Sequence, residues 1–295
     1  MFHIEEEIAS QPRCWAQAAE LAGRYADALP RSGERVAVVG CGSALNIGQV
    51  YAALRETAGY GETDAFSASE AHFDRPYDRY LFISRSGTTT ETLEALDAVP
   101  PGIPTTAITA RQGSPLANSA KDVVTVEFAD ELSIVQTRFP TSVMVLLRAH
   151  LGEDPDPLLA AAERALVAPL PEHALSARQY TFLGRGAGVG VAHEAALKLR
   201  ESAQVWAESY PAMEYRHGPI AVAGPGSLVW SLGPPPDRLA AEVLATGATF
   251  VASPFDPLVE LIVVRRVAVG LARSLGLDPD SPHHLRYSVV LARDA

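Results

Sequence analysis

A run of hydroxyl side chains around one glycine occupies residues 84–92, which read Ser-Arg-Ser-Gly-Thr-Thr-Thr-Glu-Thr. The run follows an apolar, strand-like stretch at 80–83. A strand that leads such a turn into a helix offers backbone N–H groups, hydroxyl donors and a positive helix end to one anion. The run is not a P-loop, because the Gly-x-x-x-x-Gly-Lys-Ser/Thr pattern is absent from the chain. It predicts a phosphate cradle, with a helix cap in a serine-rich loop as the alternative.

Two Gly-x-Gly turns are further candidates for ligand contact. Residues 40–43 read Gly-Cys-Gly-Ser between a strand-like stretch and a helical pattern, which is the context for a close backbone approach to a ligand. The dinucleotide-binding pattern requires a third glycine where Leu45 stands. The second turn, at 184–190, is rich in glycine, but no acidic residue follows it at the expected distance. We therefore expect neither a nicotinamide nor any other cofactor.

A second block of candidate groups contains Lys198, Glu201 and His217. Glu201 lies fifteen residues beyond Gly186, which is about 20 Å along a helix. If Glu201 is catalytic, it must therefore act on a ligand that the other half of the chain holds. The alternatives are an i, i+3 surface pair of Lys198 with Glu201, and a hydrogen-bonded loop histidine at His217 in place of a proton-transfer group.

The composition bounds the possible functions. The 295 residues carry a net charge of −11, which argues against a general nucleic-acid or anionic-membrane binder. Cys14 and Cys41 show neither metal-ligand spacing nor a disulfide framework, as is typical of a reducing cytoplasm. His283 and His284 lack a third ligand, so we expect no metal site. The acidic start has no signal core and charges interrupt the apolar stretch 258–271, so we expect a cytoplasmic protein without a membrane span.

An internal repeat predicts two similar halves. Residues 36–43 match residues 180–187 at a constant offset of 144, with an apolar strand and a Gly-x-Gly turn in each copy. In both copies the following helical pattern ends in Leu-Arg-Glu, at 54–56 and at 199–201. Two α/β halves are therefore expected in place of one large sheet.

The segment 154–157, which reads Asp-Pro-Asp-Pro, is a turn or loop signal between the two copies. We place the domain boundary there. The first domain is expected at 1–153 and includes an N-terminal helix. The second is expected at 154–295 and ends in a C-terminal tail.

Alternating strands and helices predict the fold class. The alternation indicates α/β halves with mostly parallel sheets, whose ligand-binding loops lie at the carboxyl ends of the strands. Residues 84–92 follow such a strand end. The expected strands are 35–39, 62–66, 79–83, 104–108 and 123–127, then 180–183, 227–232 and 248–252, and the longest helices are expected at 4–28, 44–58, 133–150 and 257–275.

Three motifs in this order resemble one known family. They are residues 40–43, residues 84–89, and the block 196–219, which holds Leu-Arg-Glu and Arg-His-Gly-Pro. Together they resemble the double sugar-isomerase (SIS) domain family, which includes the isomerase half of glucosamine-6-phosphate synthase, sugar-phosphate deaminases and Amadori-product deglycases. The likeness covers nearly the whole chain. It implies two similar three-layer α/β/α domains of the flavodoxin-like type and a phosphorylated sugar as ligand.

The phosphate ligands that the resemblance implies are mainly hydroxyl groups. Ser84, Ser86 and Thr89 would bind the sugar phosphate, and Ser43 would contribute from the neighbouring turn. Arg85 stands where the family commonly has glutamine. A guanidinium at this position is compatible with phosphate binding and changes its geometry.

Catalytic roles follow from the same resemblance. Glu201 would be the base that moves a proton between C1 and C2, with Lys198 in an electrostatic role beside it. His217 would assist ring opening in the site of the partner subunit, which implies a homodimer. Glu131 matches a segment that lines the sugar pocket. Tyr287 stands where the family has a lysine that can form a Schiff base, and a tyrosine cannot form an imine.

These residues support three interpretations. The leading one is an isomerase or deaminase that acts on a hexose or hexosamine 6-phosphate through an enediol, since that chemistry needs ring opening, one proton-shuttling carboxylate and a fixed phosphate. The second is an Amadori-product (fructosamine 6-phosphate) deglycase. The third is a sugar-phosphate-binding module without turnover, which Tyr287 favours. The chain begins at the sugar-isomerase part, so we expect no glutaminase activity and no complete glutamine-dependent synthase.

Overall fold

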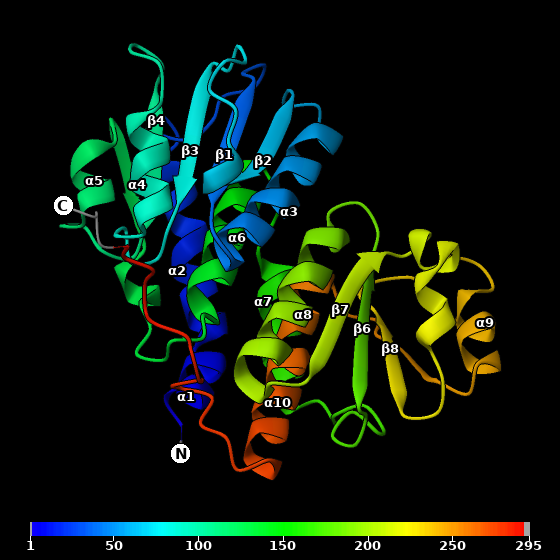
Figure 1. The fold of residues 1–295 in the computed structure, drawn as a ribbon. Helices are drawn as coiled ribbons and strands as arrows, with labels where there is room; N and C mark the ends of the chain where they lie inside the picture. Colours follow the sequence, from blue (N-terminus) through cyan, green and yellow to red (C-terminus); the bar gives the residue numbers. More distant parts are fainter. Residues whose placement is uncertain (1, 292–295) are drawn as a thin grey trace. The chain divides into compact units, whose positions relative to one another are not determined.

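Two parallel β-sheets organise the chain, and each belongs to a separate unit. The computed structural model describes residues 2–291 (Figure 1). The unit that we call the five-strand unit comprises residues 13–131, residues 138–155 and the chain from Arg286 onward. The other, called the four-strand unit, comprises the chain up to Pro12 together with residues 132–137 and 156–285.

The five-strand unit has a wholly parallel sheet in the order β2-β1-β3-β4-β5. This is the flavodoxin-like order, in which ligands bind where the strand order reverses, here between β1 and β3. The register pairs Gly40 of β1 with Ile83 of β3, so the two strands end side by side. The strands are β1 (Val36–Gly40), β2 (Thr63–Ser67), β3 (Arg79–Ile83), β4 (Thr105–Thr109) and β5 (Asp122–Thr125).

Helices cover both faces of this sheet. Leu96 of α4 and Leu116 of α5 pack on the face that carries Val39 and other buried apolar side chains. Val38 points to the opposite face, where it contacts α3. Figure 1 shows α4 and α5 together beside β3 and β4. The helices are α2 (Gln11–Arg24), α3 (Ser43–Thr57), α4 (Thr90–Asp97), α5 (Pro115–Ser119) and α6 (Arg138–His150), with short 3-10 turns at Ala68–Glu70 and Glu127–Ala129.

The four-strand unit repeats this arrangement with a parallel sheet in the order β7-β6-β8-β9. On one face Glu260 of α10 accepts a hydrogen bond from the Trp230 indole of β8 at 3.0 Å. Leu239 and Val243 of α9 pack on the other face. The elements are β6 (Gln179–Gly184), β7 (Trp206–Pro211), β8 (Ser227–Ser231), β9 (Thr249–Ala252), α1 (His3–Ala9), α7 (Asp156–Val167), α8 (Gly188–Ala203), α9 (Leu239–Ala245) and α10 (Pro257–Ser274), with 3-10 turns η3 (Glu214–His217) and η4 (Pro219–Val222).

The repeated glycines share one structural cause. In each unit the glycine that ends the first strand lies against the start of the following helix. A Cβ on Gly184 would lie 2.0 Å from the carbonyl oxygen of Gly188, and one on Gly40 would lie 2.9 Å from the carbonyl carbon of Ala44. A side chain at either position would collide with the helix, so the close approach expected here is to the chain's own backbone.

The observed units differ from the expected division after residue 153. The chain up to Pro12 and residues 132–137 belong with the second sheet, and the chain from Arg286 belongs with the first. Hydrogen bonds from backbone amides to one carboxylate explain why residues 132–137 belong with the second sheet. Glu7 accepts from the amides of Leu132 and Ser133, at 2.6 and 3.2 Å. The expected helix 133–150 therefore begins only at Arg138.

Two elements also differ from the expected secondary structure. The helix expected at 4–28, with an interruption at Gln11-Pro12, is two complete helices, α1 and α2, which separate at Ser10. Strand β7 was not expected. It is one of the two edge strands of its sheet, and its two end residues, Trp206 and Pro211, are exposed. Its sequence, Trp-Ala-Glu-Ser-Tyr-Pro, lacks the apolar run that marks the buried strands.

Candidate functional site

Hydroxyl side chains gather at the carboxyl end of β3. Ser84 Oγ accepts a hydrogen bond from the Gly87 amide at 3.1 Å, and Ser86 Oγ accepts one from the Thr88 amide at 3.2 Å. These bonds fold the segment into a turn that enters α4, where Thr89 precedes the first helical residue. We name Ser84, Ser86, Thr88 and Thr89 the hydroxyl cradle. The structure brings the three hydroxyl residues predicted here into one loop.

Ser43 lies at the neighbouring strand end. It is buried and is the first residue of α3, directly after the turn that follows β1. Because Gly40 and Ile83 are paired in the sheet, the turn with Ser43 and the hydroxyl cradle occupy the same edge. That edge is the switch point between β1 and β3, where this sheet order places a ligand.

Gly87 gives the cradle its shape, and we predict that Gly87→Ala lowers the free energy of unfolding by about 2 to 3 kcal/mol. Gly87 has a φ of +63°, and a Cβ there would lie 2.1 Å from Ser114 Oγ. Gly113→Ala is the matched control, because nothing lies within 4 Å of a Cβ at that position. Urea denaturation measures both variants, and equal stabilities would contradict the prediction.

The C-terminal tail occupies the hydroxyl cradle. Ser288 Oγ lies 3.1 Å from Ser86 Oγ, 2.9 Å from Thr88 Oγ1 and 3.4 Å from Thr89 Oγ1. The Thr90 amide, at the start of α4, donates to the carbonyl oxygen of Val289 at 3.1 Å. Two of the hydroxyl groups that the sequence assigns to a phosphate, those of Ser86 and Thr89, therefore contact the chain's own tail.

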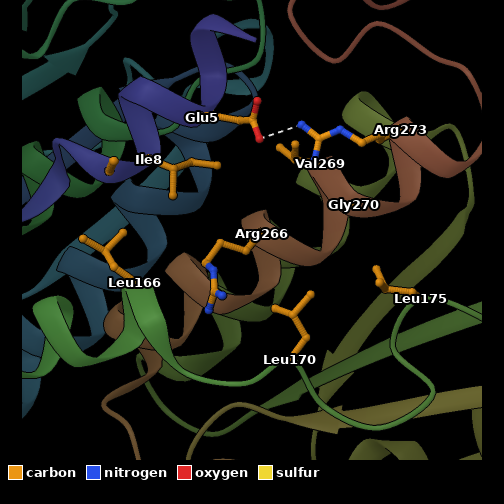
Figure 2. Close-up of a pocket in the computed structure, with 10 residues that line it drawn as sticks. Glu5, Ile8, Leu166, Leu170, Leu175, Arg266, Val269, Gly270 and Arg273 are labelled. Carbon is orange, nitrogen blue, oxygen red and sulfur yellow. Dashed lines mark hydrogen bonds and ion pairs between the residues drawn. The ribbon is translucent and has the colours of Figure 1, made fainter. Parts of the chain in front are cut away.

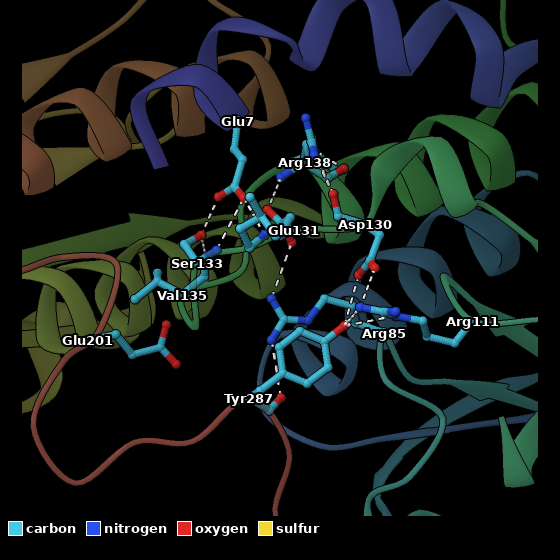
Figure 3. Close-up of polar contacts among 12 residues, drawn as sticks. Glu7, Arg85, Arg111, Asp130, Glu131, Ser133, Val135, Arg138, Glu201 and Tyr287 are labelled. Carbon is cyan, nitrogen blue, oxygen red and sulfur yellow. Dashed lines mark hydrogen bonds and ion pairs between the residues drawn. The ribbon is translucent and has the colours of Figure 1, made fainter. Parts of the chain in front are cut away.

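Arg85 belongs to a separate polar cluster, which Figure 3 shows. Its guanidinium is buried, lies 3.7 Å from the Glu131 carboxylate and donates to the backbone carbonyl of Tyr287 at 3.1 Å. Glu131 is also buried and accepts from the Arg138 amide, at the start of α6, at 2.7 Å. The structure thus gives both Arg85 and Glu131 contacts that support the fold around the cradle.

Tyr287 fastens the tail to the five-strand unit. Its ring lies 4.1 Å from the guanidinium carbon of Arg85 and 5.7 Å from that of Arg111, which are cation–π distances. Its hydroxyl donates to Asp130 at 2.8 Å (Figure 3). Burial is the main cause that raises the pKa of Tyr287, and the hydrogen bond to Asp130 adds to it. The side chain that replaces the family's lysine therefore anchors the tail.

Sequence reasoning did not identify Arg111, Asp130 or Ser288. Arg111 pairs with Asp130 at 2.7 Å, and both contact Tyr287. The only signal for these residues is their position next to segments that the resemblance covers. A local pattern cannot reveal that Ser86 and Ser288 meet across 202 positions of the chain.

A buried chain of charges in the four-strand unit leads to Glu201. Glu194, Lys198 and Glu201 share one face of α8, since they are four and three residues apart. The Lys198 ammonium lies 2.6 Å from Glu201 and 3.5 Å from Glu194. Glu194 pairs in turn with Arg265 of α10 at 3.5 Å, and Arg265 donates to Gln11 at 2.7 Å.

Exposure differs sharply along this chain of charges. The side chain of Lys198 is 1% exposed and that of Glu194 is fully buried, whereas that of Glu201 is 21% exposed. The pair of Lys198 and Glu201 is therefore not a surface pair. Glu201 lies in the last turn of α8, about 20 Å from the Gly-x-Gly end of that helix. The separation expected from the sequence thus holds within this unit.

His217 is exposed at the end of η3. Within residues 2–291 its ring has no hydrogen-bond partner. Large apolar side chains are exposed in the segments around it, namely Trp206 at 69%, Met213 at 48% and Val222 at 60%. The exposed ring of His217 thus makes no hydrogen bond to another residue within 2–291.

Both units contain cavities. One of about 530 Å³ in the five-strand unit borders the cradle through Ser86 and Thr88 and is also lined by Arg111. Another of about 430 Å³ in the four-strand unit is lined by apolar side chains together with Glu5, Arg266 and Arg273, of which Arg273 pairs with Glu5 at 2.7 Å (Figure 2). None of the predicted site residues lines the second cavity. The described residues contain no helix long and apolar enough to cross a bilayer.

The two parallel sheets and the cradle define a class, which is that of proteins with the fold of SIS-type phosphosugar isomerases. No family model matches the chain. It is 29% identical, over 98% of its length, to glutamine–fructose-6-phosphate aminotransferase (isomerizing) of Thermus thermophilus. It covers 59% of that relative, so it spans somewhat more than half the length of the curated relatives it matches.

Two solved structures have the same fold. Glucosamine-6-phosphate deaminase of Thermotoga maritima has a TM-score of 0.80 and 25% identity, over 97% of this chain and 99% of the other. The C-terminal domain of glucosamine-fructose-6-phosphate aminotransferase from Francisella tularensis has a TM-score of 0.80 and 20% identity, over 96% and 98%. The chain is thus homologous to the isomerase part of these aminotransferases and to phosphosugar isomerases and deaminases.

Proposed function

We propose that the chain is an isomerase or deaminase that acts on a hexose or hexosamine 6-phosphate, of the fructose 6-phosphate or glucosamine 6-phosphate type, through an enediol. The observation that carries the proposal is the Glu201 carboxylate. The ammonium of buried Lys198 lies 2.6 Å from this carboxylate, and the Glu201 side chain is 21% exposed to solvent. A carboxylate held in one orientation and open on one side can take a proton from a sugar carbon and return it to the neighbouring carbon.

The hydroxyl cradle is the proposed handle for the sugar phosphate. Ser84, Ser86 and Thr89, with Ser43 from the neighbouring turn, supply hydroxyl donors at the strand ends where this sheet order binds ligands. In a chain of net charge −11, such aimed donors attract a phosphate without a basic surface. Binding at a fixed handle orients the sugar for proton transfer.

Proton exchange tests the proposal directly. The purified chain is mixed with fructose 6-phosphate or glucosamine 6-phosphate in D₂O, and the proton NMR signals at C1 and C2 are followed. We expect deuterium to replace a carbon-bound proton at one of these positions. Unphosphorylated fructose and glucosamine serve as controls and should exchange far more slowly. Absence of exchange with every hexose 6-phosphate would refute the proposed activity.

Tyr287 favours a sugar-phosphate-binding module without turnover, and a deglycase is a further alternative on the same scaffold. Because its side chain cannot form an imine, any chemistry at this position runs without a Schiff base. A fructosamine 6-phosphate deglycase would release a free amine from that substrate in the same assay. A binding module would show a rise in melting temperature with sugar phosphates and no proton exchange.

A homodimer in which His217 completes the site of the partner subunit is the second part of the proposal. The exposed ring of His217 and the exposed Trp206, Met213 and Val222 support it, because such surfaces are typical of subunit interfaces. We predict that Glu201→Gln and His217→Asn are each inactive alone. After subunit exchange, half of the dimers are mixed and keep one intact site, so activity returns to about a quarter. An active monomer in sedimentation would refute the shared site.

A further inference from the structure

Ser288 contacts the same hydroxyl groups that a ligand would need in the cradle. We propose that the Ser288 hydroxyl takes the place of a phosphate oxygen in the hydroxyl cradle, so that the C-terminal tail and a phosphorylated ligand exclude one another. The proposal rests on the proposed function, because it requires the cradle to be the phosphate site. It adds that the chain carries its own competitor for that site.

The geometry around Ser288 supports exclusion. Three hydroxyls, those of Ser86, Thr88 and Thr89, lie within 3.4 Å of the single Ser288 oxygen. A serine hydroxyl donates one hydrogen bond and accepts two, so these neighbours use its full capacity. A phosphate oxygen would need the same donors at the same point. The cradle therefore serves either the tail or the anion.

The start of α4 is occupied in the same way. The Thr90 amide donates to the Val289 carbonyl at 3.1 Å, and the Leu291 amide donates to Thr90 Oγ1 at 2.9 Å. The tail groups here are neutral. A phosphate is charged, and it gains more from hydroxyl donors and from the positive helix end than a neutral carbonyl does. An anion of sufficient concentration can therefore displace the tail.

The tail is built so that only its end has to move. Tyr287 is held by Arg85, Arg111 and Asp130 and can remain in place. Beyond it the side chain of Val290 is 63% exposed and that of Leu291 is 56% exposed. Because these side chains bury little apolar surface, releasing them costs little hydrophobic free energy. Release would begin at Ser288.

Binding of inorganic phosphate, measured by calorimetry, tests exclusion with two variants of opposite effect. A chain that ends at Tyr287 keeps the anchor and loses the competitor. If the tail is docked nine-tenths of the time, the apparent Kd of this variant falls about tenfold. Ser288→Asp places a carboxylate in the cradle and should weaken phosphate binding at least tenfold. Val290→Asp adds the same charge at an exposed position and should bind phosphate like the original chain.

The possible results distinguish a failure of the exclusion from a failure of the proposed function. If the shortened chain binds phosphate no more tightly than the full chain, exclusion is wrong and the phosphate site stands. If neither chain binds phosphate, the proposed function fails and the inference fails with it. Hydrogen exchange gives a second readout, since phosphate should speed exchange of the Leu291 amide in the full chain. Unchanged or slower exchange at that amide on phosphate binding would also overturn the exclusion.

Discussion

Glutamine in place of Glu201 is expected to lower the rate of carbon-bound proton exchange about 10³-fold, within the range that a positioned acid or base contributes. The amide is nearly the same size as the carboxylate but cannot accept a proton at neutral pH. Because the hydroxyl cradle is unchanged, the affinity for inorganic phosphate should stay within about twofold, well under the 1.4 kcal/mol of a tenfold change. Exchange followed by NMR and binding followed by calorimetry report these two effects separately.

Glu163→Gln is the matched control for this variant. Glu163 is exposed on α7 in the same unit and should tolerate the change without loss of exchange. A Glu201→Gln rate within tenfold of the original would mean that another group carries the proton. A loss of phosphate binding in the same variant would instead indicate damage to the fold, and circular dichroism would reveal it.

The fold was largely predictable because buried parallel strands carry strong local signals. Strand β3, for example, lies at Arg79–Ile83, the range that the apolar run predicted. Residues 132–137 show where such reasoning fails. The carboxylate that holds them belongs to Glu7, more than a hundred positions away. No periodicity within a helix or strand encodes a bond of that kind.

The candidate site also has a part that the sequence predicts and a part that it does not. The cradle and the position of Glu201 near the end of a helix follow from local order, namely a strand, a turn and a helical repeat. The burial of Lys198 does not follow from local order, because it depends on α10, a helix that lies far from α8 in the sequence. The engagement of the cradle by Ser288 was equally hidden, since the two segments lie at distant points of the chain.

Lys198→Met is expected to lower the free energy of unfolding by about 3 kcal/mol, the cost of leaving a buried charge without one of its partners. Methionine fits a space of similar length but carries no charge. Glu194 is fully buried and would lose one of the two cations beside it, while Glu201 would lose the ammonium at 2.6 Å. Proton exchange should fall as well, because Glu201 would no longer be held in one orientation.

The second lysine of the chain is the matched control. Lys121 is exposed, so Lys121→Met should change stability by less than about 0.5 kcal/mol. A double variant, Lys198→Met with Glu194→Gln, removes one charge of each sign from the buried chain and should recover part of the lost stability. Urea denaturation of the original chain, the double variant and the three single variants Lys198→Met, Glu194→Gln and Lys121→Met measures these differences. If the double variant is less stable than Lys198→Met by the full cost that Glu194→Gln has alone, the two charges do not interact, and Lys198 does not link Glu194 to Glu201.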